Sequence, residues 1–138
     1  MKRLLFVAIF LCVLPAVCLA QDEDAIAVVQ LLKTSSSWDG SALPTYPEGK
    51  PEITIARVTI PPGAQLPLHE HPVITAGVVL SGGLTIVRED GETFRVSAGE
   101  AFAEVVNRGH SGRNDGDIPV EIVAFYAGTV DSPVTVNK

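Results

Sequence analysis

The fold of this chain is decided by one stretch, Gly63-Ala-Gln-Leu-Pro-Leu-His69-Glu-His71-Pro-Val-Ile-Thr75, in which two histidines stand one residue apart. The stretch has the composition of a β-strand, and strand side chains alternate between two faces, so His69 and His71 point the same way. Imidazole is the commonest protein ligand for divalent transition metals, and such a pair offers two adjacent coordination positions. The third and last histidine, His110, lies far along the chain in a segment predicted as a loop. We expect all three imidazoles to meet at one metal ion.

Residues 1–20 have the layout of a secretory signal peptide, with a basic start, an apolar run over residues 4–14 and small residues before an expected cleavage after Ala20. The apolar run is too short to span a membrane comfortably. A lipid anchor at Cys18 is the alternative, but Val17 is unfavourable next to a lipidated cysteine. We therefore expect an exported protein, periplasmic or secreted, with no membrane association once the leader is removed.

Composition limits the partners and the possible metal ligands of this chain. The whole sequence carries 10 Lys and Arg residues against 16 Asp and Glu residues, a formal charge of −6. Loss of the leader would remove Lys2 and Arg3, leaving 8 basic residues against 16 acidic ones and a charge of −8. Such a chain repels phosphate backbones, so we expect no nucleic-acid partner. The leader also contains both cysteines, Cys12 and Cys18, so metal ligands in the mature chain must be nitrogen or oxygen atoms.

Residues 53–128 have the pattern of short strands separated by turns rich in glycine and proline. The Asp90-Gly91 pair marks a tight hairpin, because both residue types tolerate the positive φ that such turns need. About eight to ten strands without a long helix predict an all-β sandwich or barrel, followed by a tail over residues 129–138. The predicted strands cover residues 53–60, 65–71, 73–80, 84–88, 93–96, 101–106 and 120–127.

Residues 21–52 are predicted to precede the barrel as one strand and one loop. The strand is expected over residues 26–33, where apolar and β-branched residues dominate. The loop that follows holds Trp38 and Tyr46, which have two interpretations. Their rings either pin the loop to the barrel or face a bound ligand, so both are candidates for the substrate pocket.

Two spaced motifs resemble those of a single-domain cupin, a small β-barrel of jelly-roll type. The first cupin motif is Gly, five residues, His-x-His, three or four residues, Glu, six residues, Gly, and the second is Gly, five residues, Pro, one residue, Gly, two residues, His, three residues, Asn. Matching positions of the first motif here are Gly63, His69, His71, Thr75 and Gly82. Those of the second are Gly99, Val105, Asn107, His110 and Asn114. The resemblance covers about residues 53–127, and it implies the cupin jelly-roll barrel (a double-stranded β-helix) with His69, His71 and His110 as metal ligands.

Three positions depart from the family pattern. Val105 and Asn107 replace the proline and glycine of the second motif, and asparagine tolerates the left-handed backbone better than most residues. Thr75 replaces the glutamate that is a fourth ligand in many metal cupins, and its hydroxyl is a poor substitute. Three neutral imidazoles would leave several coordination positions open, as catalytic sites do. The resemblance also implies that Asn114 fastens its loop.

Glu104 offers a replacement carboxylate. It lies in a predicted strand, where alternation puts it on one face with Phe102 and Val106. If that face looks inward, Glu104 is a ligand, a partner of the ligands or a general base, and otherwise it is a solvated residue. Gln65 lies an even number of residues before His69 and His71, so in a strand its side chain points to the same face as theirs. We therefore expect Gln65, together with Thr75, to reach the substrate pocket.

Two functions follow from this interpretation. The first is an exported small cupin that binds Fe, Mn, Ni or Zn through three histidines and oxygenates or isomerises a small organic molecule. The second is a non-catalytic barrel that binds a metal or a small ligand. Apolar runs over residues 73–80 and 120–127 are compatible with a homodimer.

Overall fold

The structure is a computed structural model that describes residues 26–138, so the predicted signal peptide and its cleavage after Ala20 lie outside the described residues. The described chain forms nine β-strands and no helix, and therefore it contains no helix that could cross a membrane. The strands are β1 (Pro51–Ile60), β2 (His69–Glu70), β3 (Ile74–Ser81), β4 (Gly83–Arg88), β5 (Thr93–Ser97), β6 (Ala101–Ala103), β7 (His110–Asn114), β8 (Val120–Thr129) and β9 (Val136–Asn137).

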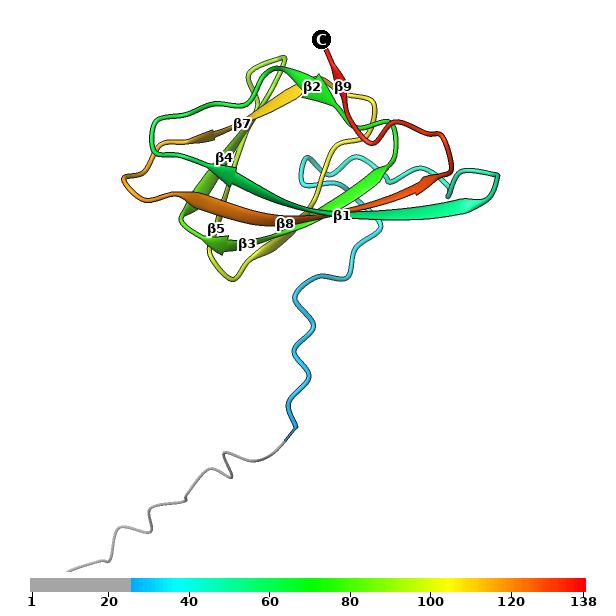
Figure 1. The fold of residues 1–138 in the computed structure, drawn as a ribbon, viewed down its shortest axis with the longest axis horizontal. Coiled ribbons are helices and arrows are strands. Elements are labelled where there is room, and N and C mark those ends of the chain that lie inside the picture. Colours follow the sequence, from blue (N-terminus) through cyan, green and yellow to red (C-terminus); the bar gives the residue numbers. More distant parts are fainter. Residues whose placement is uncertain (1–25) are drawn as a thin grey trace, which may run out of the picture.

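The strands build two antiparallel sheets that face each other as a jelly-roll barrel (Figure 1). One sheet has the order β1-β8-β3-β6 and the other has the order β5-β4-β7-β2-β9. Most neighbours in a sheet are therefore distant in sequence, with the β4–β5 hairpin as an exception. That hairpin turns at Gly91 with a φ of 90°, which confirms the tight turn predicted at Asp90-Gly91.

Alternation along β1, β3 and β8 sends every second side chain into the space between the sheets. Eight buried apolar side chains form the main core there: Ile60, Val79, Leu84, Ile86, Val96, Phe102, Val120 and Ile122. Full burial of one such side chain contributes about 1.5–3 kcal/mol. This cluster therefore holds the two sheets together.

Two asparagines shape the chain around β7. Asn107 adopts a φ of 55°, which confirms that asparagine takes the left-handed backbone where the cupin motif has glycine. Asn114 is 1 % exposed, and its amide donates hydrogen bonds to the carbonyls of Ile60 at 2.9 Å and Ile118 at 2.8 Å. It therefore fastens the loop that follows β7 to the end of β1, as the resemblance implied.

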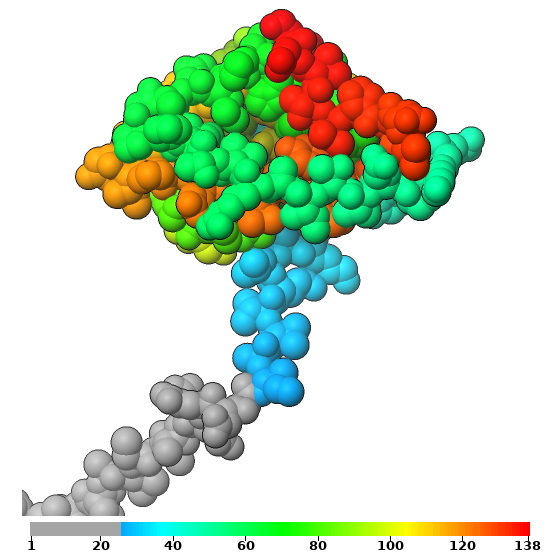
Figure 2. Space-filling model, viewed as in Figure 1, coloured from blue at the N-terminus to red at the C-terminus, as the bar shows by residue number. Residues whose placement is uncertain are grey.

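Three segments differ from the sequence-based expectation. Residues 26–33 form no strand, because no strand of the described barrel pairs with them, and they stand clear of the barrel (Figure 2). His110 lies inside a strand rather than a loop, since β4 and β2 pair with β7 on its two sides. Residues 136–137 of the predicted tail form β9, which pairs with β2 and extends that sheet.

Candidate metal centre

The three histidines of the chain converge inside the barrel, as expected. His69 in β2 lies directly opposite His110 in β7, which puts their side chains on the same face. His71 lies two residues after His69 and shares that face. The ring nitrogens that could bind a metal ion all lie within 4.8 Å of one another. The strand pairing therefore brings distant parts of the sequence to one point.

Main-chain carbonyls orient all three rings through their Nδ1 atoms. The bonds run from His69 to Pro67 at 2.8 Å, from His71 to Val134 at 2.8 Å and from His110 to Arg108 at 2.9 Å. A carbonyl can only accept, so Nδ1 carries the proton and the lone pair of each ring lies on Nε2. Metal-binding histidines usually have such a second partner, which fixes their tautomer and ring orientation.

Burial keeps the imidazoles neutral. Burial lowers the pKa of all three imidazoles, that of His71 to about 4. Near neutral pH the rings would therefore not have to lose a proton before they bind a metal ion. His110 is 1 % exposed, and its Nε2 has no hydrogen-bond partner among the described residues. Such an unpaired buried atom costs about 1–3 kcal/mol, and a metal ion would satisfy it. The three-histidine site therefore fits a divalent ion.

Glu104 adds a carboxyl group to the same site. It is 8 % exposed, and its Oε2 lies 3.7 Å from Nε2 of His110, so it faces the histidines rather than solvent. Burial raises the pKa of Glu104 to about 7, and a hydrogen bond from Trp38 opposes that shift. A carboxyl group that titrates near neutrality can both accept and donate a proton at ordinary pH.

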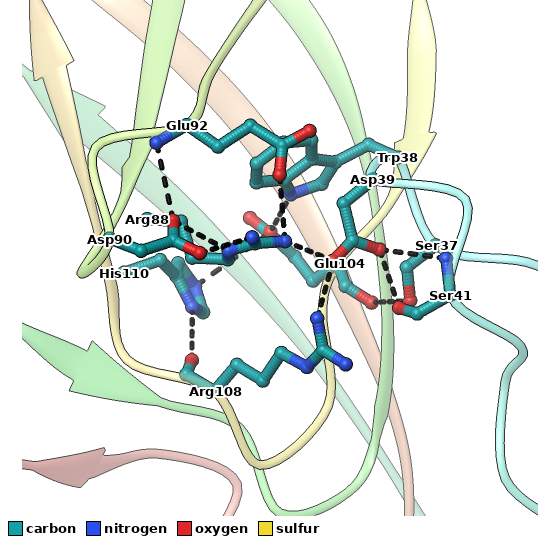
Figure 3. Close-up of polar contacts among 10 residues, drawn as sticks. All are labelled: Ser37, Trp38, Asp39, Ser41, Arg88, Asp90, Glu92, Glu104, Arg108 and His110. Carbon is teal, nitrogen blue, oxygen red and sulfur yellow. Dashed lines mark hydrogen bonds and ion pairs between the residues drawn. The ribbon is translucent and has the colours of Figure 1, made fainter.

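The loop before β1 holds Glu104 from behind the site (Figure 3). Nε1 of Trp38 donates to Oε2 of Glu104 at 3.2 Å, and the hydroxyl of Ser37 donates to the Glu104 carbonyl at 2.7 Å. The indole also stacks on Phe94 with ring centroids 5.4 Å apart. Trp38 does not line the cavity described below, so it pins the loop to the barrel and contacts the site through Glu104.

Asp39 ties the same loop to the barrel by charge. Its Oδ2 accepts hydrogen bonds from Arg88 at 2.6 Å and from Arg108 at 3.0 Å, and its side chain is 1 % exposed. Burial raises the pKa of Asp39, but bonds from Ser41 and Arg88 and the charge of Arg108 outweigh burial and hold it below its ordinary value. The carboxylate next to Trp38 therefore stays ionised and anchored.

An apolar cavity of about 260 Å³ adjoins the three histidines. Its apolar walls include Val58, Leu66, Leu84, Phe102, Ile122 and Ala124. Its polar groups are His69, His71, Thr75, Glu104, His110, Tyr126, Thr135 and Asn137. None of the described residues that line it is lysine or arginine, so the cavity offers no fixed cation to an anionic ligand.

Two sequence-based candidates lie outside this cavity. Tyr46 is 77 % exposed and does not line the cavity, so its ring neither pins the loop nor faces a ligand there. Gln65 is exposed and bonds Ser111 at 3.1 Å, whereas its neighbour Leu66 lines the cavity. The parity argument failed for Gln65 because regular pairing is interrupted between it and β2. Thr75, at 2 % exposed, does line the cavity.

Other residues of the cavity were not predicted. Tyr126 packs edge-on against His71, with ring centroids 5.4 Å apart, and burial raises the pKa of its phenol. Alternation along β8 could have revealed it, since it shares a face with Ile122 and Ala124. Thr135 and Asn137 come from the predicted tail, and no local pattern marks them.

These observations define a class of protein, a small antiparallel β-barrel with a three-histidine centre in its interior. Residues 56–126 match the cupin domain family. The chain therefore belongs to the cupin family, and the matched segment is a single cupin domain.

Solved structures of three enzymes are similar to this fold. A DMSP lyase, DddQ, from Ruegeria pomeroyi DSS-3 is 21 % identical with a TM-score of 0.54, over 62 % of this chain and 43 % of that protein. The oxalate decarboxylase of Lactobacillus farciminis, in a formate complex, is 24 % identical with a TM-score of 0.54, over 62 % and 26 % of the two chains.

The oxalate decarboxylase of Bacillus subtilis, described with Mn(II) centres, is 31 % identical with a TM-score of 0.52, over 62 % of this chain and 23 % of that one. This chain thus spans less than half the length of each of the three proteins. The first two likenesses show a shared fold.

Proposed function

We propose that this protein is a metal-dependent enzyme that oxygenates or isomerises a small organic molecule. One observation carries the proposal: the carboxyl group of Glu104 is buried and faces the histidines, with its Oε2 3.7 Å from Nε2 of His110. A carboxyl group that is held out of water beside the three histidines is positioned to accept a proton from a bound molecule and to return it.

The ion would be held by His69, His71 and His110. When bound, it would supply Lewis-acid or redox chemistry toward a substrate oxygen. Three imidazoles suit Fe, Mn, Ni and Zn alike. The Mn(II) centres of the similar Bacillus subtilis decarboxylase make manganese the first ion to test.

The cavity walls indicate the kind of substrate. Apolar side chains dominate and the described lining contains no lysine or arginine, which favours a molecule with an oxygen-bearing head and an apolar body over a dicarboxylate. Glu104 would accept a proton from the substrate. In isomerisation it returns that proton to another atom of the substrate. In oxygenation dioxygen is the second reactant, both of its atoms enter the product, and Glu104 returns the proton to the product.

The alternative is a non-catalytic barrel that binds a metal or a small ligand. Thr75 favours it, because this residue replaces the glutamate that the resemblance implies as a fourth ligand. Elemental analysis of the purified protein, followed by oxygen-uptake and isomerisation assays with phenolic and dicarbonyl compounds, separates the two. Turnover that is lost in Glu104→Gln supports the enzyme, and a fully loaded protein without turnover supports the binding barrel.

Export is a separate proposal that rests on residues 1–20. It is tested by sequencing the N-terminus of the protein recovered outside the cytoplasm. A chain that begins at Gln21 supports it, and a chain that begins at Met1 inside the cell contradicts it.

A further inference from the structure

The three histidine rings of the candidate metal centre are held in two different ways. The rings of His69 and His110 each donate from Nδ1 to a carbonyl two residues earlier in their own segment. His71 instead donates to the carbonyl of Val134, which lies 63 residues later in the sequence. The orientation of this one ring therefore depends on a segment that is distant from it in the chain.

That segment runs along the edge of the barrel beside β2 (Figure 1). Residues 134–138, here called the strap, include β9, which is the outermost strand of its sheet. Next to the Val134 carbonyl, the hydroxyl of Thr135 lies 3.2 Å from Nδ1 of His71. Thr135 and Asn137 also line the cavity, so the strap forms part of the cavity wall.

Few interactions hold the strap, and several of them are exposed to solvent. β9 forms two residue pairs with β2 and has no neighbour on its other side among the described strands. The amide of Lys138 donates to the carbonyl of Leu68 at 3.0 Å, and its Nζ lies 2.9 Å from Oε2 of Glu70 in a partly exposed ion pair. Val134 packs against the buried cluster that contains Tyr126. A segment with so few buried contacts opens locally at a much lower cost than the barrel itself.

We propose, on the basis of the three-histidine metal centre proposed above, that the strap positions His71 and that its local opening is the route by which a metal ion enters and leaves. In the closed state the Val134 carbonyl fixes the tautomer of His71, so its Nε2 presents a lone pair beside those of His69 and His110. In the open state His71 loses that partner and the cavity loses part of its wall, while the other two rings keep their partners.

A bound metal ion would in turn hold the strap closed. An ion that needs His71 in its closed orientation binds the closed state more tightly, so by thermodynamic linkage it shifts the strap toward that state. The turn before the strap is fixed separately, because the amide of Val130 donates to the carbonyl of Lys50 at 3.0 Å. Opening can therefore be confined to the strap.

The rate of metal release measures this opening. Protein loaded with Mn(II) or Zn(II) is mixed with excess chelator, and release from the wild type is compared with release from Lys138→Ala. We expect release to be about two- to fivefold faster in the variant, because a partly exposed ion pair contributes modestly to the closed state. Simple electrostatics predicts the opposite, since loss of a positive charge near the site would retain a cation more tightly.

Arg57→Ala is the matched control. It removes the same charge from another partly exposed ion pair, the one with Glu121 in the other sheet, and it should release metal at the wild-type rate. Val134→Ala is a second strap variant, which keeps the carbonyl but weakens the apolar contact beneath it. We expect it to speed release about fivefold. Circular dichroism verifies that each variant is folded before its release rate is compared.

Hydrogen exchange followed by mass spectrometry gives a readout that a merely structural strap would not move. Bound metal should slow exchange over residues 134–138 by about fivefold or more and leave the β4–β5 hairpin unchanged. Wild-type release rates in both strap variants overturn the inference while the metal centre stands, and so does strap exchange that is insensitive to metal. A wild type that binds neither ion overturns the metal centre and the role of the strap together.

Discussion

The backbone amide of Glu104 donates a 2.9 Å hydrogen bond to the carbonyl of Thr75. Thr75 occupies the position at which the first cupin motif has glutamate, so the chain carries its acidic residue beside that position, just beyond the end of the neighbouring strand β6. The carboxyl group consequently approaches His110 from the side of β6 and is held there by Trp38. This relationship underlies the predictions about the site.

Replacement of His71 by alanine should abolish most metal binding. The ring is 5 % exposed and supplies one of three Nε2 lone pairs, so its removal should lower affinity by at least about 100-fold, more than the loss of an outer-shell partner. Elemental analysis of the variant beside the wild type measures this. Gln65→Ala is the control, because Gln65 lies nearby in sequence but outside the cavity. Equal metal content in His71→Ala and the wild type would remove His71 from the site.

Glu104→Gln should retain the metal but lose activity. The amide has nearly the same shape, yet it cannot accept a proton, and general acid–base catalysis contributes about 10²–10⁴-fold. Steady-state kinetics of metal-loaded protein with a substrate found for the wild type gives the ratio. Undiminished kcat in the variant would assign Glu104 a structural role.

Trp38→Phe should shift the pH profile of activity. The substitution keeps an aromatic ring against Phe94 but removes the hydrogen bond to Glu104, which holds the pKa of that group down. The pKa of Glu104 should therefore rise, and the limb of the profile that reports its ionisation should move to higher pH. A profile identical to that of the wild type would mean that Trp38 serves only to anchor the loop.

Asp39→Asn should destabilise the protein at neutral pH but not in acid. The folded state lowers the pKa of Asp39, so the ionised group contributes stability above its ordinary pKa near 3.8, and that contribution is lost as pH falls through the folded value. The substitution leaves Arg88 and Arg108 with a weaker partner, at a cost of about 1–3 kcal/mol at pH 7. Urea unfolding of both proteins at pH 7 and below pH 3 tests this. A difference that persists unchanged in acid would contradict an ionic role.

Local patterns in the sequence were enough to predict the barrel and the histidines that it brings together. A period of two along β1, β3 and β8, the Asp90-Gly91 turn and the spacing of the histidine motifs each depend on residues close together in the chain. Such local features also predicted the left-handed conformation of Asn107. Convergence of the three histidines followed from the resemblance to cupins and is confirmed.

Tertiary structure alone decided what surrounds the histidines. The alternation of side chains between two faces is a local rule. It gave the wrong face for Gln65 because strand pairing is interrupted between Gln65 and β2, and it could not decide whether Glu104 faces solvent or the cavity. The contact from Trp38 to Glu104 and the pairing of β9 with β2 join residues that are far apart in sequence. Both contacts depend on which strands become neighbours in the sheets. A strand is stabilised by side chains of the neighbouring strands, which lie far away in the sequence, so strand order is decided only by the packing of the whole chain.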